Sequence, residues 1–128
     1  MNAVRVERIE QLRELIGREL GPTDWLEITQ ADIDKFAEVS RDDQWIHVET
    51  ERAATESPYG TTVPHGNLTL SLADHFRHQL IRHSGVKVGI NYGFDRVRFR
   101  RRSRPDRGYE RAPRSSRWTS SATAGGTS

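Results

Sequence analysis

Apolar residues recur at three- and four-residue steps along three stretches of the chain. Residues 7–20 carry the first stripe, and a Gly-Pro pair follows it, so an amphipathic helix that ends there is expected. Residues 29–40 carry the second, and Thr29 and Asp32 have the spacing of a capping box with Asp in place of Glu. Residues 67–83 form the longest stripe, which predicts a mostly buried helix that the next glycine ends.

Shorter patterns fill the rest of the first 99 residues. "WLEIT", residues 25–29, is a candidate strand, and "ETERAATES", residues 49–57, predicts a short helix. Prolines and glycines make "PYGTTVPHG", residues 58–66, a turn-rich connection. Residues 87–99 alternate with β-prone side chains, which predicts one long strand or one arm of a hairpin. Asn91 in this stretch is expected either to pair in the ladder or to face a pocket.

Charge and pattern both change after Phe99. Residues 1–99 hold 12 basic and 16 acidic side chains, a net charge of −4, whereas residues 100–128 hold 8 and 2, a net charge of +6. The second segment has no apolar period and ends in Ser, Thr, Ala and Gly, a composition typical of disorder. We therefore expect one domain over residues 1–99 and an arginine-rich tail over 100–128 that is disordered or read out of frame.

Several classes of protein and site are excluded at this stage. The chain has no cysteine, so disulfides and thiolate metal sites are excluded. The charged N-terminus lacks the apolar run of a signal peptide, and no apolar stretch reaches the roughly 20 residues of a membrane span. A cytoplasmic protein without membrane contact is expected. His75 and His78 have a spacing that suits a metal pair, but no third ligand lies nearby, which favours a solvated helix face.

The stretch "RDDQWIHVE", residues 41–49, places His47 five positions after Asp42. A carboxylate and an imidazole that reach one water can remove its proton, because histidine titrates near neutral pH. The alternative is that Asp42 caps a turn and His47 lies on the surface, since this spacing alone is a weak pattern. Trp45 and Ile46 fit both interpretations, either as core filling or as an apolar anchor that holds the two polar groups in place.

A second candidate lies in "VPHGNLTLSL", at the start of the longest stripe. Gly66 in the first turn of a helix would leave its backbone N–H unpaired, and such a group can bind a carbonyl oxygen that gains charge. Gly66 could equally serve only to permit the turn. His65 in this position is more often structural than catalytic.

Three motifs in this order carry a resemblance to a known family: "FAEVSRDDQWIHVETERAA", "YGTTVPHGNLTLSL" and "INYGFDRVRF". They resemble the MaoC-like dehydratases, the (R)-specific enoyl-CoA hydratases, and above all the branch related to nodulation protein N. The resemblance covers residues 23–99. It implies an α+β hot-dog fold, in which an antiparallel sheet wraps a long central helix, and a homodimer. Since the sheet needs further strands, the fold is expected to be incomplete after residue 99.

The resemblance also implies roles for three residues. Asp42 and His47 match the pair that activates water, which adds to a trans-2-enoyl thioester such as an enoyl-CoA to give a 3-hydroxyacyl thioester. Gly66 matches the glycine whose N–H binds the thioester carbonyl. No metal or redox cofactor is implied. Two departures stand out: Arg41 replaces a glycine, which strains the loop if φ is positive there, and Asn67 replaces a bulky apolar residue.

Two other classes of function stay open. A hot-dog thioesterase would use an acid on the central helix, and Asp74 is the acid available there. A truncated, inactive hot-dog domain could instead bind nucleic acid through the basic tail, although nucleic acid is not the expected partner. Salt-dependent DNA binding that is lost on deletion of residues 100–128 would favour this interpretation.

The tail has an explanation at the level of the gene. Within the degeneracy of the code, one base added after the Phe99 codon lets GC-rich codons for this segment be read as "FPAPVPTGPGLRARA", which resembles the continuation usual in the family. We therefore expect a frameshift after Phe99. Sequencing the coding DNA through this codon tests it, since an unchanged reading frame would show that the arginine-rich segment is genuine.

Overall fold

The structure, a computed structural model, describes residues 3–99, 103–104, 108–109, 115–116 and 120–121. The chain divides into two units. Unit 1 comprises Met1–Trp25, Leu72–Gly93 and Arg117–Ser128, and unit 2 comprises Leu26–Ser71 and Phe94–Ser116. Each unit mixes helices and strands, which confirms the α+β class.

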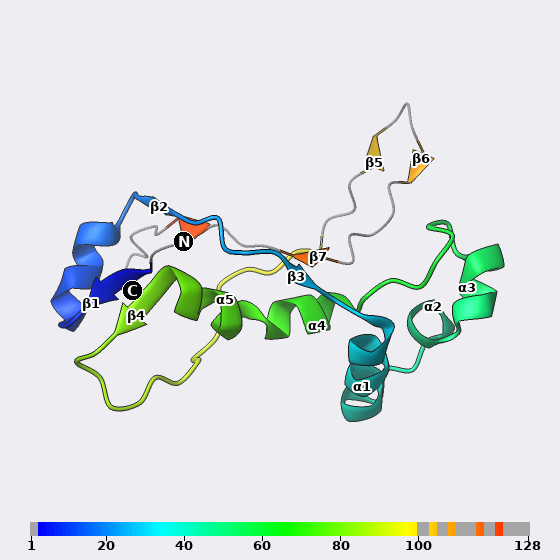
Figure 1. Cartoon of the computed structure of the whole chain (residues 1–128), viewed down its shortest axis with the longest axis horizontal. Coiled ribbons are helices and arrows are strands. Elements are labelled where there is room, and N and C mark those ends of the chain that lie inside the picture. The colour runs from blue at the N-terminus through cyan, green and yellow to red at the C-terminus, as the bar shows by residue number, and fades with distance from the viewer. Residues whose placement is uncertain (1–2, 100–102, 105–107, 110–114, 117–119, 122–128) are drawn as a thin grey trace. The chain divides into compact units, whose positions relative to one another are not determined.

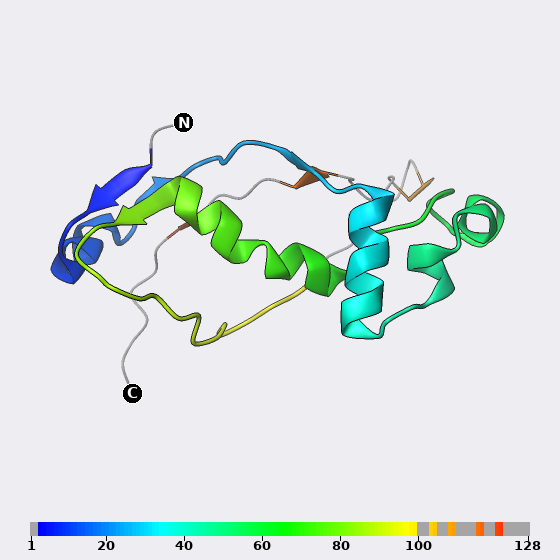
Figure 2. The same cartoon turned by 60° about the horizontal axis from the view of Figure 1, so that its bottom comes forward.

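Unit 1 is built around two short strand pairs. Its elements are β1 (Val4–Val6), the 3₁₀ helix η1 (Ile9–Leu15), β2 (Glu19–Leu20), α5 (Ala73–Leu80), β4 (Ile81–His83) and β8 (Ser120–Ser121). β1 and β4 pair in parallel, side by side in both views (Figures 1 and 2), and β2 pairs antiparallel with β8. Val6, Leu15, Leu20 and Leu80 form the buried apolar cluster of this unit.

The prediction of an α-helix over residues 7–20 is wrong. The segment forms a 3₁₀ helix over Ile9–Leu15, and strand β2 follows it. Its apolar side chains do not share one buried face, because Ile9 and Ile16 are exposed while Leu15 and Leu20 are buried. Burial of the two leucines in the cluster with Val6 therefore outweighs the helical period of the local sequence.

Unit 2 contains most of the helices. Its elements are β3 (Leu26–Glu27), α1 (Gln30–Ser40), α2 (Trp45–Val48), α3 (Thr50–Glu56), α4 (Gly66–Ser71), β5 (Ser103–Arg104), β6 (Gly108–Tyr109) and β7 (Ser115–Ser116). β3 pairs with β7 and β5 with β6, both antiparallel. α2 contacts both α1 and α3, and the three helices lie near one another in Figure 1.

Helix α1 confirms its predicted capping box. The Thr29 hydroxyl accepts a hydrogen bond from the Asp32 N–H at 3.2 Å, and the Asp32 carboxylate accepts one from the Thr29 N–H at 3.0 Å. Hydrogen bonding to the Asp32 carboxylate, first from the Thr29 backbone N–H and then from the Thr29 side chain, holds the pKa of Asp32 below its usual value because it stabilises the charged form. Ile33 and Ala37 are buried, so the helix packs with the predicted face.

The prediction of a single helix over residues 67–83 is wrong in two respects. Leu72 separates α4 from α5, and the last three residues form strand β4 instead of a helical turn. The strand forms because the backbone groups of β4 bond to β1, and one N–H cannot serve both a helix and a sheet. The expected burial is confirmed, since Leu68, Phe76 and Leu80 are all buried.

The strand expected over residues 87–99 is also wrong. These residues lie in no ladder among the described part of the chain, and Ile90 is 85% exposed. A strand requires partner N–H and C=O groups, and no described residue supplies them here. Asn91 is exposed and pairs in no ladder, so the first of its two predicted roles is not observed.

The larger fold is described only in part. Strands in the described residues form four two-stranded pairs, and a sheet that wraps a helix is not seen there. The predicted tail, residues 100–128, contains β5 to β8, while its other residues lie outside the described ones, so its predicted disorder stays a prediction. None of the described helices has both the length and the apolar character needed to cross a bilayer.

Candidate active site in unit 2

The loop between α1 and α2 carries Asp42 in an exposed position. Arg41 ends α1 in the left-handed conformation, with φ 67° and ψ 12°. The position thus has the positive φ that glycine adopts without strain. Arginine in place of glycine at this position therefore strains the loop. The Asp42 N–H donates to the Ser40 Oγ at 3.3 Å, which holds the turn into the loop.

We expect Arg41→Gly to stabilise the protein. A side chain in the left-handed region costs about 1 kcal/mol, part of which the greater freedom of glycine in the unfolded chain offsets. The free energy of unfolding in urea should therefore rise by about 0.5 kcal/mol. Asp43→Gly is the matched control, because Asp43 lacks a positive φ and glycine there should destabilise. Equal effects of both changes would contradict the assignment of strain to Arg41.

His47 lies on the four-residue helix α2 and is half-buried. Its Nδ1 lies 2.7 Å from the Val63 carbonyl oxygen. A carbonyl oxygen only accepts, so Nδ1 carries the proton and Nε2 presents its lone pair. The Val63 N–H in turn donates to the Ile46 carbonyl at 3.1 Å, which ties this loop to α2. The ring is therefore fixed in one tautomer with a free basic nitrogen.

A further pair of side chains, which the sequence did not reveal, holds the backbone of His47. Gln30 donates from Nε2 to the His47 carbonyl at 2.9 Å, and its Oε1 accepts a hydrogen bond from the Thr62 hydroxyl. Thr62 is buried and directly precedes Val63. Both anchors of His47 are thus joined, although the glutamine lies 17 positions away in the sequence. No local pattern predicts this contact.

His65 contacts both candidate catalytic residues. It is 3% exposed, and its Nε2 lies 2.8 Å from the Asp42 backbone carbonyl oxygen. Its ring stacks on that of His47 with centroids 3.8 Å apart and planes 23° apart, and Phe36 packs against it at 4.9 Å. The prediction that His65 is structural does not anticipate that it contacts both members of the pair.

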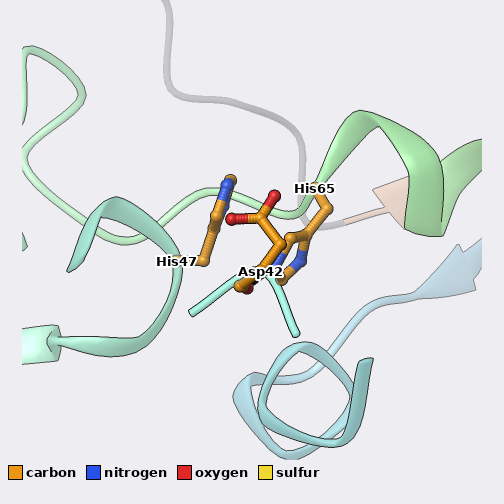
Figure 3. Close-up of side chains that lie close together, drawn as sticks. All are labelled: Asp42, His47 and His65. Atoms are coloured by element: carbon orange, nitrogen blue, oxygen red, sulfur yellow. Dashed lines mark hydrogen bonds between the residues drawn. The ribbon is translucent and has the colours of Figure 1, made fainter. Parts of the chain in front are cut away.

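Asp42, His47 and His65 gather at one place, as Figure 3 shows. One ligand atom of each lies within 4.8 Å of the others, a spacing that one ion could bridge. Two imidazoles on one ion aim their in-plane lone pairs at a common point, whereas the stacked rings here hold theirs in nearly parallel planes. His47 Nδ1 and His65 Nε2 already face backbone carbonyls. The geometry therefore favours acid–base chemistry at this site over metal binding.

Gly66 is the first residue of α4, directly after His65. Its N–H has no hydrogen-bond partner among the described residues, so it can donate to a ligand. The ring of Phe99 covers its Cα. A Cβ built at this position would lie 2.6 Å from two ring carbons and 2.8 Å from a third. Glycine at this position therefore leaves room for the Phe99 ring, and its backbone N–H is free to donate.

Gly66→Ala should lower the free energy of unfolding by about 1 kcal/mol, because the new methyl group overlaps the Phe99 ring, which is 58% exposed and can shift in part. Phe99→Ala removes that ring, so the same glycine substitution should cost little in this background. Urea unfolding of the single and double variants measures the coupling. Gly89→Ala is the control, since nothing lies within 4 Å of a Cβ there. A Gly66→Ala cost that is unchanged without Phe99 would contradict the contact.

The other residues singled out in the sequence lie as follows. Trp45 and Ile46 are half-buried on α2, and Trp45 also packs under the Arg52 guanidinium at 4.4 Å. His75 and His78 are exposed on α5, as expected for a solvated face. Asp74 pairs with Arg77 at 3.1 Å on the same helix, and Asn67 is exposed.

Comparison with known proteins identifies the family to which the sequence is similar. A family model described as "MaoC like domain" matches residues 11–107. The chain is 45% identical over 93 residues to 3-hydroxyacyl-thioester dehydratase Z of Mycobacterium tuberculosis, which covers 73% of this chain and 61% of that protein. It is 48% identical over 90 residues to nodulation protein N of Rhizobium leguminosarum bv. viciae, which covers 66% of this chain and 53% of that protein.

The chain thus spans only 53% to 61% of the length of these relatives. The family match nevertheless includes every residue of the site in unit 2, from Gln30 to Phe99. The resemblance seen in the three sequence motifs is confirmed. The hot-dog fold is that of the family, and the described residues of this chain show its helices with two-stranded pairs. This chain belongs to the MaoC-like domain family.

Proposed function

We propose that this protein is a hydratase/dehydratase, which adds water to a trans-2-enoyl thioester such as an enoyl-CoA and catalyses the reverse reaction. The observation that carries the proposal is the approach of Asp42 and His47, with His47 in the tautomer that leaves Nε2 free. The similarity to a protein named 3-hydroxyacyl-thioester dehydratase supports the same reaction class.

In this proposal, one water molecule binds between the Asp42 carboxylate and His47 Nε2. Both groups accept hydrogen bonds from the water, and one of them takes its proton as the oxygen bonds to the β-carbon. The carbon–carbon double bond opens, and the proton is delivered to the α-carbon, so the atoms balance without an oxidant or a metal. Dehydration runs through the same steps in reverse. Holding water and acceptor together supplies the orientation that the reaction requires.

Gly66 would stabilise the charge that develops during the addition. As water attacks the β-carbon, negative charge moves to the thioester carbonyl oxygen. The unpartnered Gly66 N–H is one residue from His65, which contacts both catalytic groups, so it is available to donate to this oxygen. A donor that is already in place stabilises the transition state without reorganisation.

Hydration and thioester hydrolysis are distinguished by one experiment with trans-2-butenoyl-CoA. Loss of the ultraviolet absorbance of the enoyl thioester reports hydration, and release of free thiol reports a thioesterase. We expect hydration without thiol release, lowered to a small residual rate by Asp42→Asn and retained by Asp74→Asn. Thiol release that depends on Asp74 would replace the hydratase by a thioesterase. Absence of both activities in a folded protein would contradict the proposal outright.

We further propose a homodimer as the active form and an acyl thioester as the only partner that the reaction requires. The site in unit 2 needs no redox cofactor for the steps above. The mass of the protein in solution, measured by light scattering, tests the assembly. A monomer with full activity would refute the dimer and leave the reaction class intact.

A further inference from the structure

The two catalytic groups of the proposed function are anchored unequally. His47 is held through its ring by Val63 and through its backbone by Gln30, and it is half-buried. Asp42 is exposed and lies on a loop without regular structure. Its backbone N–H bonds to Ser40 at 3.3 Å, a long contact, and its carbonyl oxygen accepts from His65 at 2.8 Å. The position of Asp42 therefore depends mainly on His65.

The hydrogen bond to Asp42 defines the state of His65. Because the backbone carbonyl of Asp42 only accepts, His65 must carry its proton on Nε2, and its Nδ1 is then an acceptor. Nδ1 is buried and has no partner among the described residues. His65 thus has the opposite tautomer to His47, whose proton is on Nδ1. A ring that is 3% exposed and packs against both His47 and Phe36 has little freedom to change this arrangement.

We propose that His65 is a positioning residue for the reaction. Its Nε2–H fixes the backbone of Asp42, and its ring, stacked on His47, sets the separation of the two catalytic groups. The inference rests on the proposed function, and it assigns His65 no contact with the substrate. Loss of the donor should allow the Asp42 loop to rotate, while His47 keeps its own anchors. A displacement of about 1 Å in such a group lowers a rate by about 10²-fold.

Two substitutions separate the donor from the ring. His65→Phe keeps an aromatic ring that can stack on His47 but removes the N–H. His65→Gln places an amide N–H near the position of Nε2 but removes the ring. We expect His65→Phe to lower kcat for trans-2-butenoyl-CoA by about 10²-fold with little change in KM. The kcat of His65→Gln should be at least tenfold higher than that of His65→Phe, although its thermal stability is no higher than that of His65→Phe.

The kinetic outcome separates this inference from the function on which it rests. A wild-type protein without hydratase activity would overturn the proposed function itself. An active wild type whose kcat is unchanged by His65→Phe, or a glutamine variant no faster than the phenylalanine variant, would overturn the positioning role alone. In an Asp42→Asn background, His65→Phe should have no further effect on the residual rate. A full additional loss there would also overturn the role.

A measurement on the wild-type protein covers the case in which a variant fails to fold. Long-range proton–nitrogen NMR spectra assign the protonated nitrogen of each imidazole. Near neutral pH we expect His65 to be protonated on Nε2 and His47 on Nδ1. A His65 ring with its proton on Nδ1 could not donate to Asp42, and this result would overturn the inference without any variant.

Discussion

His47→Asn should lower kcat for hydration of trans-2-butenoyl-CoA by roughly 10²–10⁴-fold, the range that one general base contributes. Asparagine places its amide N–H near the position of Nδ1, so the hydrogen bond to the Val63 carbonyl can persist. The basic nitrogen at Nε2 is lost. The substitution therefore removes the proton acceptor and leaves the anchor of α2 in place.

The control for this prediction is His75→Asn. His75 is exposed on α5, and its replacement should leave kcat within about twofold of the wild type, as expected for a surface change. Unfolding in urea should show similar stability for His47→Asn and the wild type. If His47→Asn retained at least half of the wild-type kcat, His47 could not be the base, and the assignment of the site would fail.

Phe76→Ala should lower the free energy of unfolding by about 3–5 kcal/mol. Phe76 on α5 is 0% exposed, so the alanine leaves a cavity that its rigid surroundings fill only in part. Domains of this kind are stabilised by about 5–15 kcal/mol in total, so the variant should lose a large share of its stability. Chemical unfolding followed by circular dichroism measures the difference.

Val88→Ala is the matched control for a buried apolar residue. Val88 is 69% exposed, and its truncation should change the stability by no more than about 0.5 kcal/mol. A loss below about 1 kcal/mol for Phe76→Ala would mean that the Phe76 ring is not closely packed by its neighbours.

Part of the site could be predicted because its signals are local. The capping box joins Thr29 to Asp32 over three positions, and the hydrogen bonds confirm it. Asp42 and His47 are five positions apart, and a short helix brings both to one place. The strain at Arg41 is predictable from the sequence on the condition that φ is positive there, since it depends only on the backbone at the end of α1.

The contacts that orient the proposed catalytic groups are not local. Gln30 reaches the His47 backbone over 17 positions and Thr62 over 32, and His65 reaches Asp42 over 23. Glutamine and threonine occur throughout protein surfaces, so nothing in their identity distinguishes these two. The sequence distinguishes His65 only by its place before Gly66, and its contact with both proposed catalytic residues depends on how the chain packs in unit 2.

The sequence by itself determined the helix α1, the family and the residues that can perform acid–base chemistry, because each depends on residue types at short spacing. Only the tertiary structure decided that residues 67–83 divide into two helices and a strand, since the β1 backbone competes for the hydrogen bonds of residues 81–83. It also decided which ring nitrogen of His47 is free, because that depends on the carbonyl group of Val63. A helical pattern expresses the preference of a segment, and partners distant in the sequence determine whether that preference prevails.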